Sequence, residues 1–185
     1  SSDLILYGSI FCLHLLLMAA FTAIPSIMTE QVGLPAAQHA WMYLVTLAVA
    51  LPGVALLIRR RGELQDPRPV MALTIALAVG GLFIALEAGS LTLLGFGLAL
   101  FFVGFTALET LLPAWVSIFA PVSLRGTAMG VFSSAQFLGV FSGGVVGGAV
   151  LQWGGVGALF ALLSGLTGLW LAGVWRFARA PTVAF

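Results

Sequence analysis

The sequence predicts an all-α integral membrane protein, and three observations lead to this fold class. Of its 185 residues, 61% are hydrophobic and only 7% are charged, and the mean hydropathy is +1.16. A soluble domain carries about 25% charged residues, because it must cover itself with polar surface. Apolar stretches of the length that a bilayer requires follow one another along the chain. Helices are expected in them, since a spanning helix satisfies its own backbone and the residue alternation of a membrane β-barrel is not seen.

Six apolar segments fill the chain, and each is long enough to cross a bilayer. Because a span uses roughly 20 residues, a chain of this length holds about six spans and leaves no room for a soluble domain. We therefore predict a single six-helix transmembrane domain over residues 1–185. Its helices are expected at residues 4–28, 41–58, 70–87, 91–119, 126–151 and 156–176.

The first segment, 4–28, is too long for the apolar core of a signal peptide and has no basic residue before it. We therefore interpret it as a retained span. Aromatic, thioether and imidazole side chains recur along it at intervals of three and four residues, which places them on one helical face. The residues of this face are Tyr7, Phe11, His14, Met18, Phe21 and Pro25.

The second and third segments differ in their ends and in their polar content. Trp41 begins the segment 41–58 and arginines follow it, as expected for residues at the two membrane boundaries. The segment 70–87 has no charged side chain between residues 70 and 85, and the last segment, 156–176, is uncharged before its final residue. We expect both to be outer scaffold helices that face lipid.

The fourth segment, 91–119, has a second face of aromatic and polar residues, formed by Phe102, Phe105, Thr106, Glu109 and Pro113. An adaptable aromatic and methionine surface with one acid suits a cavity for apolar or cationic organic molecules. Ordinary packing between helices is the alternative interpretation of the same faces. The residues assigned to a substrate cavity are Tyr7, Phe11, Met18, Phe21, Phe102, Phe105, Thr106 and Gln136.

The fifth segment, 126–151, has small residues at intervals of four, which places them on one helical face. Such a face lets another backbone approach closely in a membrane. The predicted packing glycines are Gly126, Gly130, Gly139, Gly143 and Gly147. Prolines interrupt three of the predicted helices, at Pro25, Pro52 and Pro113, and either bend them or are tolerated through neighbouring helices.

The basic residues predict the orientation of the chain in the membrane. All lie in alternate connections, as Arg59, Arg60, Arg61, Arg68, Arg125, Arg176 and Arg179. The opposite connections contain none. Because cytoplasmic loops are enriched in basic residues, we expect these connections and both chain termini to face the cytoplasm.

Two ionisable residues lie well inside predicted spans, His14 in the first and Glu109 in the fourth. A charged side chain at the membrane centre costs about 3 kcal/mol on insertion scales, so such residues normally face a cavity or a partner. We predict that both carry protons, with Glu109 lying closer to the cytoplasm than His14. The alternatives are a structural hydrogen bond or an ion pair with Arg125 for Glu109, and a hydrogen-bonded core histidine for His14.

Several other functions find no support in the sequence. The net charge is +1 and there is no basic patch, which speaks against nucleic acid as a partner. No serine motif of a hydrolase and no pair of metal ligands is recognisable, so we expect no enzyme activity, no metal and no cofactor. The single cysteine, Cys12, lies among apolar residues and is expected to have a packing role.

Two stretches of the sequence resemble a known family. The first is Cys12-Leu-His-Leu-Leu-Leu-Met18 with Pro25 and the later Leu34-Pro-Ala-Ala-Gln-His39. The second runs from Leu111-Leu-Pro113 through Arg125-Gly-Thr-Ala-Met-Gly-Val-Phe-Ser133 to Gln136-Phe-Leu-Gly-Val140. Over nearly its whole length the chain resembles the C-terminal six-helix half of a major facilitator superfamily transporter, in the YajR-like branch of drug:proton antiporters.

This resemblance implies one half of a major facilitator fold, built as a 3+3 inverted repeat in the bacterial inner membrane and working by alternating access. The segments 4–28 and 91–119 would line the central cavity. The segments 41–58 and 126–151 would flank the contact with an N-terminal six-helix half, while the remaining two would face lipid. The connection after residue 58 is a degenerate relative of the family's signature loop.

The leading hypothesis is therefore half of a secondary active transporter that exports hydrophobic or cationic small molecules in exchange for protons. Its partners would be the lipid bilayer, the N-terminal half, the small-molecule substrate and protons. The alternative is a self-associating six-helix membrane channel or assembly element that uses the glycine face of segment 126–151.

Overall fold

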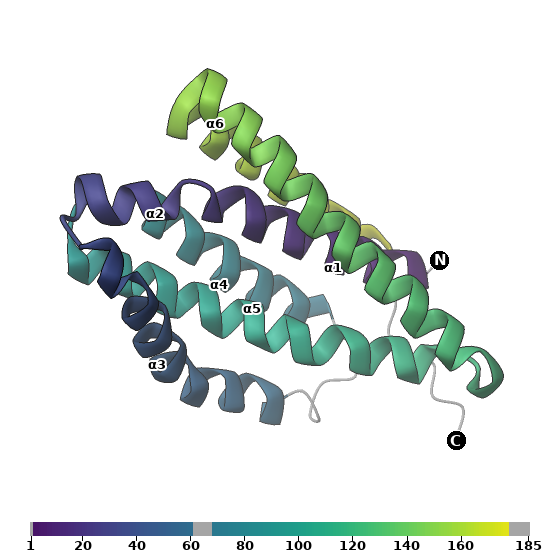
Figure 1. Cartoon of the computed structure of the whole chain (residues 1–185). Helices are drawn as coiled ribbons and strands as arrows, with labels where there is room; N and C mark the ends of the chain where they lie inside the picture. The colour runs from purple at the N-terminus through teal and green to yellow at the C-terminus, as the bar shows by residue number, and fades with distance from the viewer. Residues whose placement is uncertain (1, 61–67, 178–185) are drawn as a thin grey trace.

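The computed structural model describes residues 2–60 and 68–177, and it consists of long helices joined by short turns. The helices lie side by side in an elongated bundle (Figure 1). In chain order the elements are α1 (Ser2–Phe21), α2 (Ile24–Ser26), the π-helix η1 (Ile27–Gln31), the 3-10 helix η2 (Ala36–Gln38), α3 (His39–Arg60), α4 (Arg68–Leu86), α5 (Leu91–Phe119), the 3-10 helix η4 (Val122–Leu124) and α6 (Arg125–Phe177).

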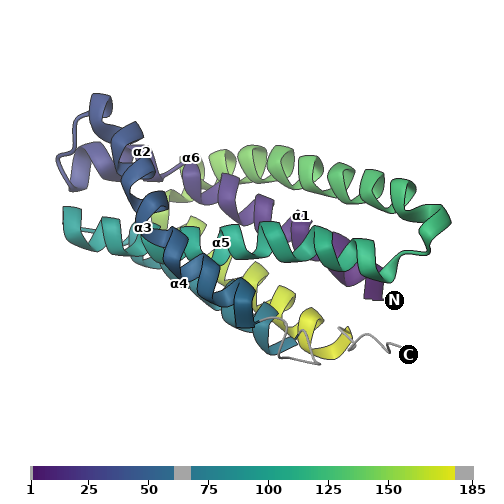
Figure 2. The same cartoon turned by 90° about the horizontal axis from the view of Figure 1, so that it is seen from below.

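Five helical stretches of the described residues are long and apolar enough to cross a membrane. The last of them, Val122–Arg176, has 55 residues, whereas a bilayer needs roughly 20. Gly155 breaks α6, because its φ of 68° and ψ of −170° are not helical and suit only glycine. The chain turns back at this point, so that the second arm of α6, 156–177, returns toward the end of the bundle at which the first arm, 125–154, begins, and the two arms spread apart from the turn (Figure 2). The predicted segments 126–151 and 156–176 thus fall within one element, and the count of six membrane crossings stays a prediction.

The first predicted segment is not one continuous helix. The α1 helix ends at Phe21, and Pro25 occupies the first turn of α2, where a missing N–H does no harm. The π-helix η1 then continues the chain to Gln31. In contrast, Pro52 and Pro113 lie inside α3 and α5, which remain helical, so of the two predicted alternatives these two prolines follow the second, tolerance within the helix. Packed neighbours re-satisfy the backbone groups that a proline frees in a membrane helix.

The first arm of α6 packs closely against α1 through part of its glycine row. Three successive glycines of this arm lie against the backbone of Phe11, Leu15 and Ala19, namely Gly139, Gly143 and Gly147. A Cβ atom at any of them would collide with α1. The other two members of the predicted row, Gly126 and Gly130, have no described atom within 4 Å of such a Cβ position.

A second glycine contact joins α4 to α5, and it was not predicted. A Cβ atom on Gly104 of α5 would collide with the carbonyl oxygen of Thr74, and one on Gly81 of α4 would collide with the backbone of Phe101. With 56% of its most apolar window buried, α4 is the most buried of the five candidate spans. An uncharged surface packs equally well against lipid and against another helix, so the expectation that the rest of α4 faces lipid stays a prediction.

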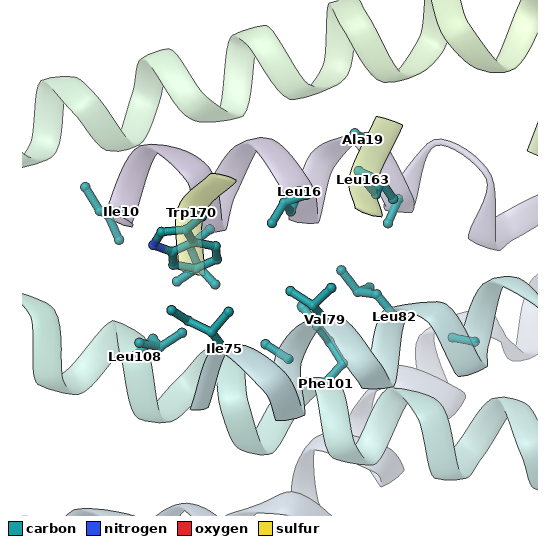
Figure 3. Packing of buried hydrophobic residues seen from close by; sticks show 14 of the residues in the cluster. Ile10, Leu16, Ala19, Ile75, Val79, Leu82, Phe101, Leu108, Leu163 and Trp170 are labelled. Carbon is teal, nitrogen blue, oxygen red and sulfur yellow. The ribbon is translucent and has the colours of Figure 1, made fainter. Parts of the chain in front are cut away.

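The core lies between α1, α4, α5 and the second arm of α6. Figure 3 shows Leu16 of α1, Val79 of α4 and Phe101 of α5 pointing toward one another, with Leu163 and Trp170 of α6 closing the cluster. All of these side chains are buried. The indole N–H of Trp170 also donates a hydrogen bond of 2.9 Å to the hydroxyl oxygen of Ser9 on α1. The second arm of α6 therefore has one face in the core.

The described arginines lie at helix ends: at the end of α3, the beginning of α4 and the two ends of α6. In Figure 1 these four ends lie at the same end of the bundle as the beginning of α1. The guanidinium carbon of Arg68 stacks 5.8 Å above the ring of Trp175. Arg61 and Arg179 lie outside the described residues. The membrane orientation itself stays a prediction.

Candidate functional site

Three polar side chains from three helices meet within the bundle. His14 comes from α1, Glu109 from α5 and Gln136 from the first arm of α6. The Nε2 atom of His14 lies 3.5 Å from Oε1 of Glu109 and 3.0 Å from Nε2 of Gln136. The same Gln136 nitrogen lies 3.5 Å from Oε2 of Glu109. The structure thus brings together both residues predicted to carry protons and one residue assigned to the cavity.

The backbone of α1 determines which nitrogen of His14 carries the hydrogen. Nδ1 of His14 lies 3.2 Å from the carbonyl oxygen of Ile10, one turn earlier. Because a carbonyl oxygen can only accept, Nδ1 is the donor, and the neutral ring presents a lone pair at Nε2. That lone pair accepts an N–H of Gln136. His14 is therefore hydrogen-bonded at both nitrogens while it is uncharged.

His14 and Glu109 differ in how far their side chains are exposed. The side chain of His14 is 8% exposed, whereas that of Glu109 is 31% exposed. Among the described residues, Oε1 of Glu109 is buried without a hydrogen-bond partner, and it faces Nε2 of His14. A proton held between these two atoms would supply the missing hydrogen bond. The arrangement can therefore gain and lose a proton at a site with one face open.

The contact corrects one expectation about Glu109 and argues against one of the alternatives. The sequence placed Glu109 nearer the cytoplasm than His14, but their side chains touch. The reason is that α5, with 29 residues, is longer than α1, so a depth counted from its far end misplaces Glu109. Its ion-pair partner in the described part of the chain is His14 and not Arg125, which lies at the exposed beginning of α6.

A chain of aromatic rings leads away from this site. The rings of His14 and Phe105 meet edge to face at 5.6 Å, and Phe105 lies 5.2 Å from Phe101. Phe101 in turn lies 5.6 Å from Phe21, which stacks on Tyr43 of α3 at 5.5 Å. Such offset and edge contacts are the favourable geometries for aromatic pairs. This series of ring contacts connects α1, α5 and α3.

The remaining residues assigned to the cavity are placed in different surroundings. Phe102 lies 5.1 Å from Phe101 and so joins the aromatic chain. Tyr7 instead lines a small cavity of about 190 Å³ where α5 connects to α6. The backbone of Phe11 lies against a glycine of α6, while Met18 and Thr106 are half-buried. The predicted faces of 4–28 and 91–119 therefore serve partly for helix packing.

Two residues of the site went unrecognised in the role that the structure gives them. Tyr43 was not singled out, although it is the one phenol in its apolar helix, and that isolation was the available signal. Gln136 was assigned to substrate contact, and its amide also contacts both His14 and Glu109. Its partners are 122 and 27 residues away in the sequence, so no local pattern could have revealed them.

Comparisons with known proteins identify a transporter family. Residues 6–184 match the Major Facilitator Superfamily. The chain is 37% identical over 168 residues to the inner membrane transport protein YajR of Escherichia coli K12, which covers 90% of this chain and 36% of YajR.

Two uncharacterised transporters of Buchnera aphidicola are similar as well. The one from the Baizongia pistaciae strain is 37% identical over 73 residues, or 40% of this chain and 18% of that protein. The one from the Acyrthosiphon pisum strain is 31% identical over 138 residues, or 74% and 35%. The matches thus span little more than a third of each relative at most. By its sequence and its relatives, the chain belongs to the Major Facilitator Superfamily.

Proposed function

We propose that this chain is the C-terminal six-helix half of a secondary active transporter that exports hydrophobic or cationic small molecules in exchange for protons. Membership of the superfamily supports transport, and the name of YajR supports a location in the bacterial inner membrane. The match to about a third of YajR supports a larger protein with an N-terminal half. The turn at Gly155 supports six crossings rather than five.

The observation that carries proton coupling is the contact of His14 with Glu109 at 3.5 Å inside the bundle. Without a proton between them, Glu109 is a charged carboxylate in surroundings that disfavour charge. A proton bound to Glu109 makes its carboxyl group neutral. A proton bound to His14 instead makes an ion pair of the two side chains. Each state changes the attraction between α1 and α5, and a ligand that binds two conformations unequally shifts their populations.

The aromatic chain beside the pair is the surface proposed for substrate contact. Phe102 and Phe105 are half-buried, so their rings retain open surface near Glu109. Aromatic faces attract organic cations, and a nearby carboxylate adds to this attraction. A cationic substrate and a proton would therefore compete for Glu109, which is the relation that exchange requires.

The test is the substitution Glu109→Gln in the complete carrier that contains this chain, reconstituted in liposomes with a pH-sensitive dye inside. Glutamine keeps the shape but cannot release a proton, so we expect substrate-driven proton flux to fall to the background of empty liposomes. Expression and the thermal unfolding temperature should stay unchanged.

Glu87→Gln is the matched control, because Glu87 is an exposed acid in the turn after α4. It should transport like the unsubstituted carrier. Undiminished proton flux in Glu109→Gln would contradict the proposal.

A further inference from the structure

Gln136 has a geometry that substrate contact alone does not explain. A single amide nitrogen lies within hydrogen-bonding reach of both proton carriers, at 3.0 Å from Nε2 of His14 and 3.5 Å from Oε2 of Glu109. The residue is also held in place. One turn further along α6, Gly139 lies directly against the backbone of Phe11 on α1, so the two helices cannot separate here without losing that contact.

The donor and acceptor roles of the three groups restrict when these hydrogen bonds exist. An amide nitrogen only donates, while an unprotonated imidazole Nε2 and a carboxylate oxygen both accept. Gln136 can therefore bond to both partners only while neither contacted atom carries a proton. When a proton arrives at Nε2 of His14 or at Oε2 of Glu109, that atom becomes a donor and faces another donor.

Rotation of the amide group resolves this conflict. The oxygen and nitrogen of a glutamine amide have nearly the same shape, so a turn of about 180° about its last torsion exchanges them. The oxygen then accepts from the newly protonated partner. We propose that Gln136 is a positioning residue whose amide bonds through nitrogen to the proton-free pair and through oxygen to the protonated pair, and so determines the pH at which the pair takes up its proton.

This inference rests on the proposed function for its biological meaning. Rotation of the Gln136 amide would couple the position of α6 to whether His14 of α1 and Glu109 of α5 hold a proton. Few other ionisable groups are near. On α1 they are Tyr7 and Cys12, and α3 contributes Tyr43. The arginines of α3, α4 and α6 lie at helix ends, with Arg125 roughly 16 Å along α6 from Gln136.

Nitrogen NMR of the imidazole rings tests the inference without measuring transport, in the complete carrier reconstituted in lipid nanodiscs. The signal of His14 is identified as the one that His14→Gln removes, and His39→Gln removes that of the other histidine of this chain. We expect the neutral ring of His14 to carry its hydrogen on Nδ1, with a hydrogen-bonded Nε2. A neutral ring with its hydrogen on Nε2 would overturn the proposal, whatever any variant does.

The matched variant is Gln136→Met, which keeps the length of the side chain and removes the amide. The amide nitrogen bonds to two partners in the proton-free pair, whereas the rotated oxygen bonds only to the protonated partner. Loss of the amide therefore costs the proton-free pair one hydrogen bond more, and it should raise the titration midpoint of His14 by about one pH unit, a tenfold change. Ser134→Ala on the same helix is the control, since its hydroxyl donates to the carbonyl oxygen of Gly130, one turn earlier on α6. It should leave the midpoint in place.

An unchanged or lowered midpoint in folded Gln136→Met would overturn the role of Gln136. The proposed function has a separate outcome, since it fails if Glu109→Gln still carries protons. The two results can therefore be told apart.

Discussion

Glu109 shows how a buried acid selects its partner. Arg125 offers a permanent positive charge, but it lies at the exposed beginning of α6, where water already solvates it. His14 and Glu109 both lie in the interior of their helices, and Oε1 of Glu109 is buried where it faces Nε2 of His14. The sequence identified both residues from their position inside apolar spans. It could not show that they meet, because contact depends on how α1 and α5 are packed.

Phe101 was not among the predicted site residues, yet it lies at the centre of the aromatic chain. It is 1% exposed and contacts Phe21, Phe102 and Phe105. We expect Phe101→Ala to destabilise the chain by about 3–5 kcal/mol, because it removes a buried ring and leaves a cavity. A thermal unfolding scan in detergent should show a loss of roughly 10 °C.

Phe96 on the same helix provides the control, as it is 55% exposed. Phe96→Ala should shift the unfolding temperature much less than Phe101→Ala. Equal shifts for the two variants would mean that the aromatic chain does not stabilise the bundle.

Among the elements, α4 and α5 show what hydropathy can and cannot distinguish. The predicted span 91–119 coincides with α5, and the prediction for α4 differs from its observed bounds by two residues at most at either end. Long apolar runs bounded by polar residues therefore locate helices well. The same runs do not tell whether a helix faces lipid or protein, since both environments are apolar. The large buried share of α4 became visible only when its neighbours were in place.

The glycine row of α6 offers a prediction at the level of helix packing. A Cβ atom at Gly143 would collide with the carbonyl oxygen of Leu15, whereas one at the next residue, Gly144, meets no described atom within 4 Å. We expect Gly143→Ala to destabilise the chain by about 1–3 kcal/mol, because the backbones of α1 and α6 must separate. Its unfolding temperature in detergent should fall by several degrees.

Gly144→Ala adds the same methyl group to the neighbouring position and is the matched control. Alanine favours helix over glycine, so this variant should be as stable as the original chain or slightly more stable. The close approach of α1 and α6 would be disproved if both variants unfolded at the same temperature.

At the scale of the whole molecule, the bundle gathers the arginine-bearing ends of α3, α4 and α6 at one end. In any bundle of spans, alternate connections lie at the same end. The shared position of these helix ends therefore agrees with the occurrence of the arginines in alternate connections of the sequence. The excess of arginines predicts that this end is cytoplasmic. The turn between α4 and α5 would then face the opposite side.

Cysteine labelling tests this orientation. The single native cysteine, Cys12, is first replaced by serine, and Glu87→Cys or Ser123→Cys is introduced on either side of α5. In intact spheroplasts a membrane-impermeant maleimide should label Glu87→Cys, which lies after α4. It should label Ser123→Cys, which lies between α5 and α6, only after permeabilisation. The reverse pattern would contradict the predicted orientation.

The sequence by itself indicated that the protein lies in a lipid bilayer, that it is built from helices, and which family it resembles. These properties follow from composition, from the length of apolar runs and from local motifs, all of which are written along the chain. It also singled out His14 and Glu109, because an ionisable side chain inside an apolar span is costly.

Only the tertiary structure decided which side chains meet. His14, Glu109 and Gln136 come from three helices, and His14 and Gln136 are 122 residues apart. Their contact depends on the close approach of α1 and α6 at Gly139 and on the rotation of α5 about its axis. Such packing depends on steric fit between whole helices. The spacing of the glycines indicated a packing face on α6, but it did not tell which helix would occupy that face.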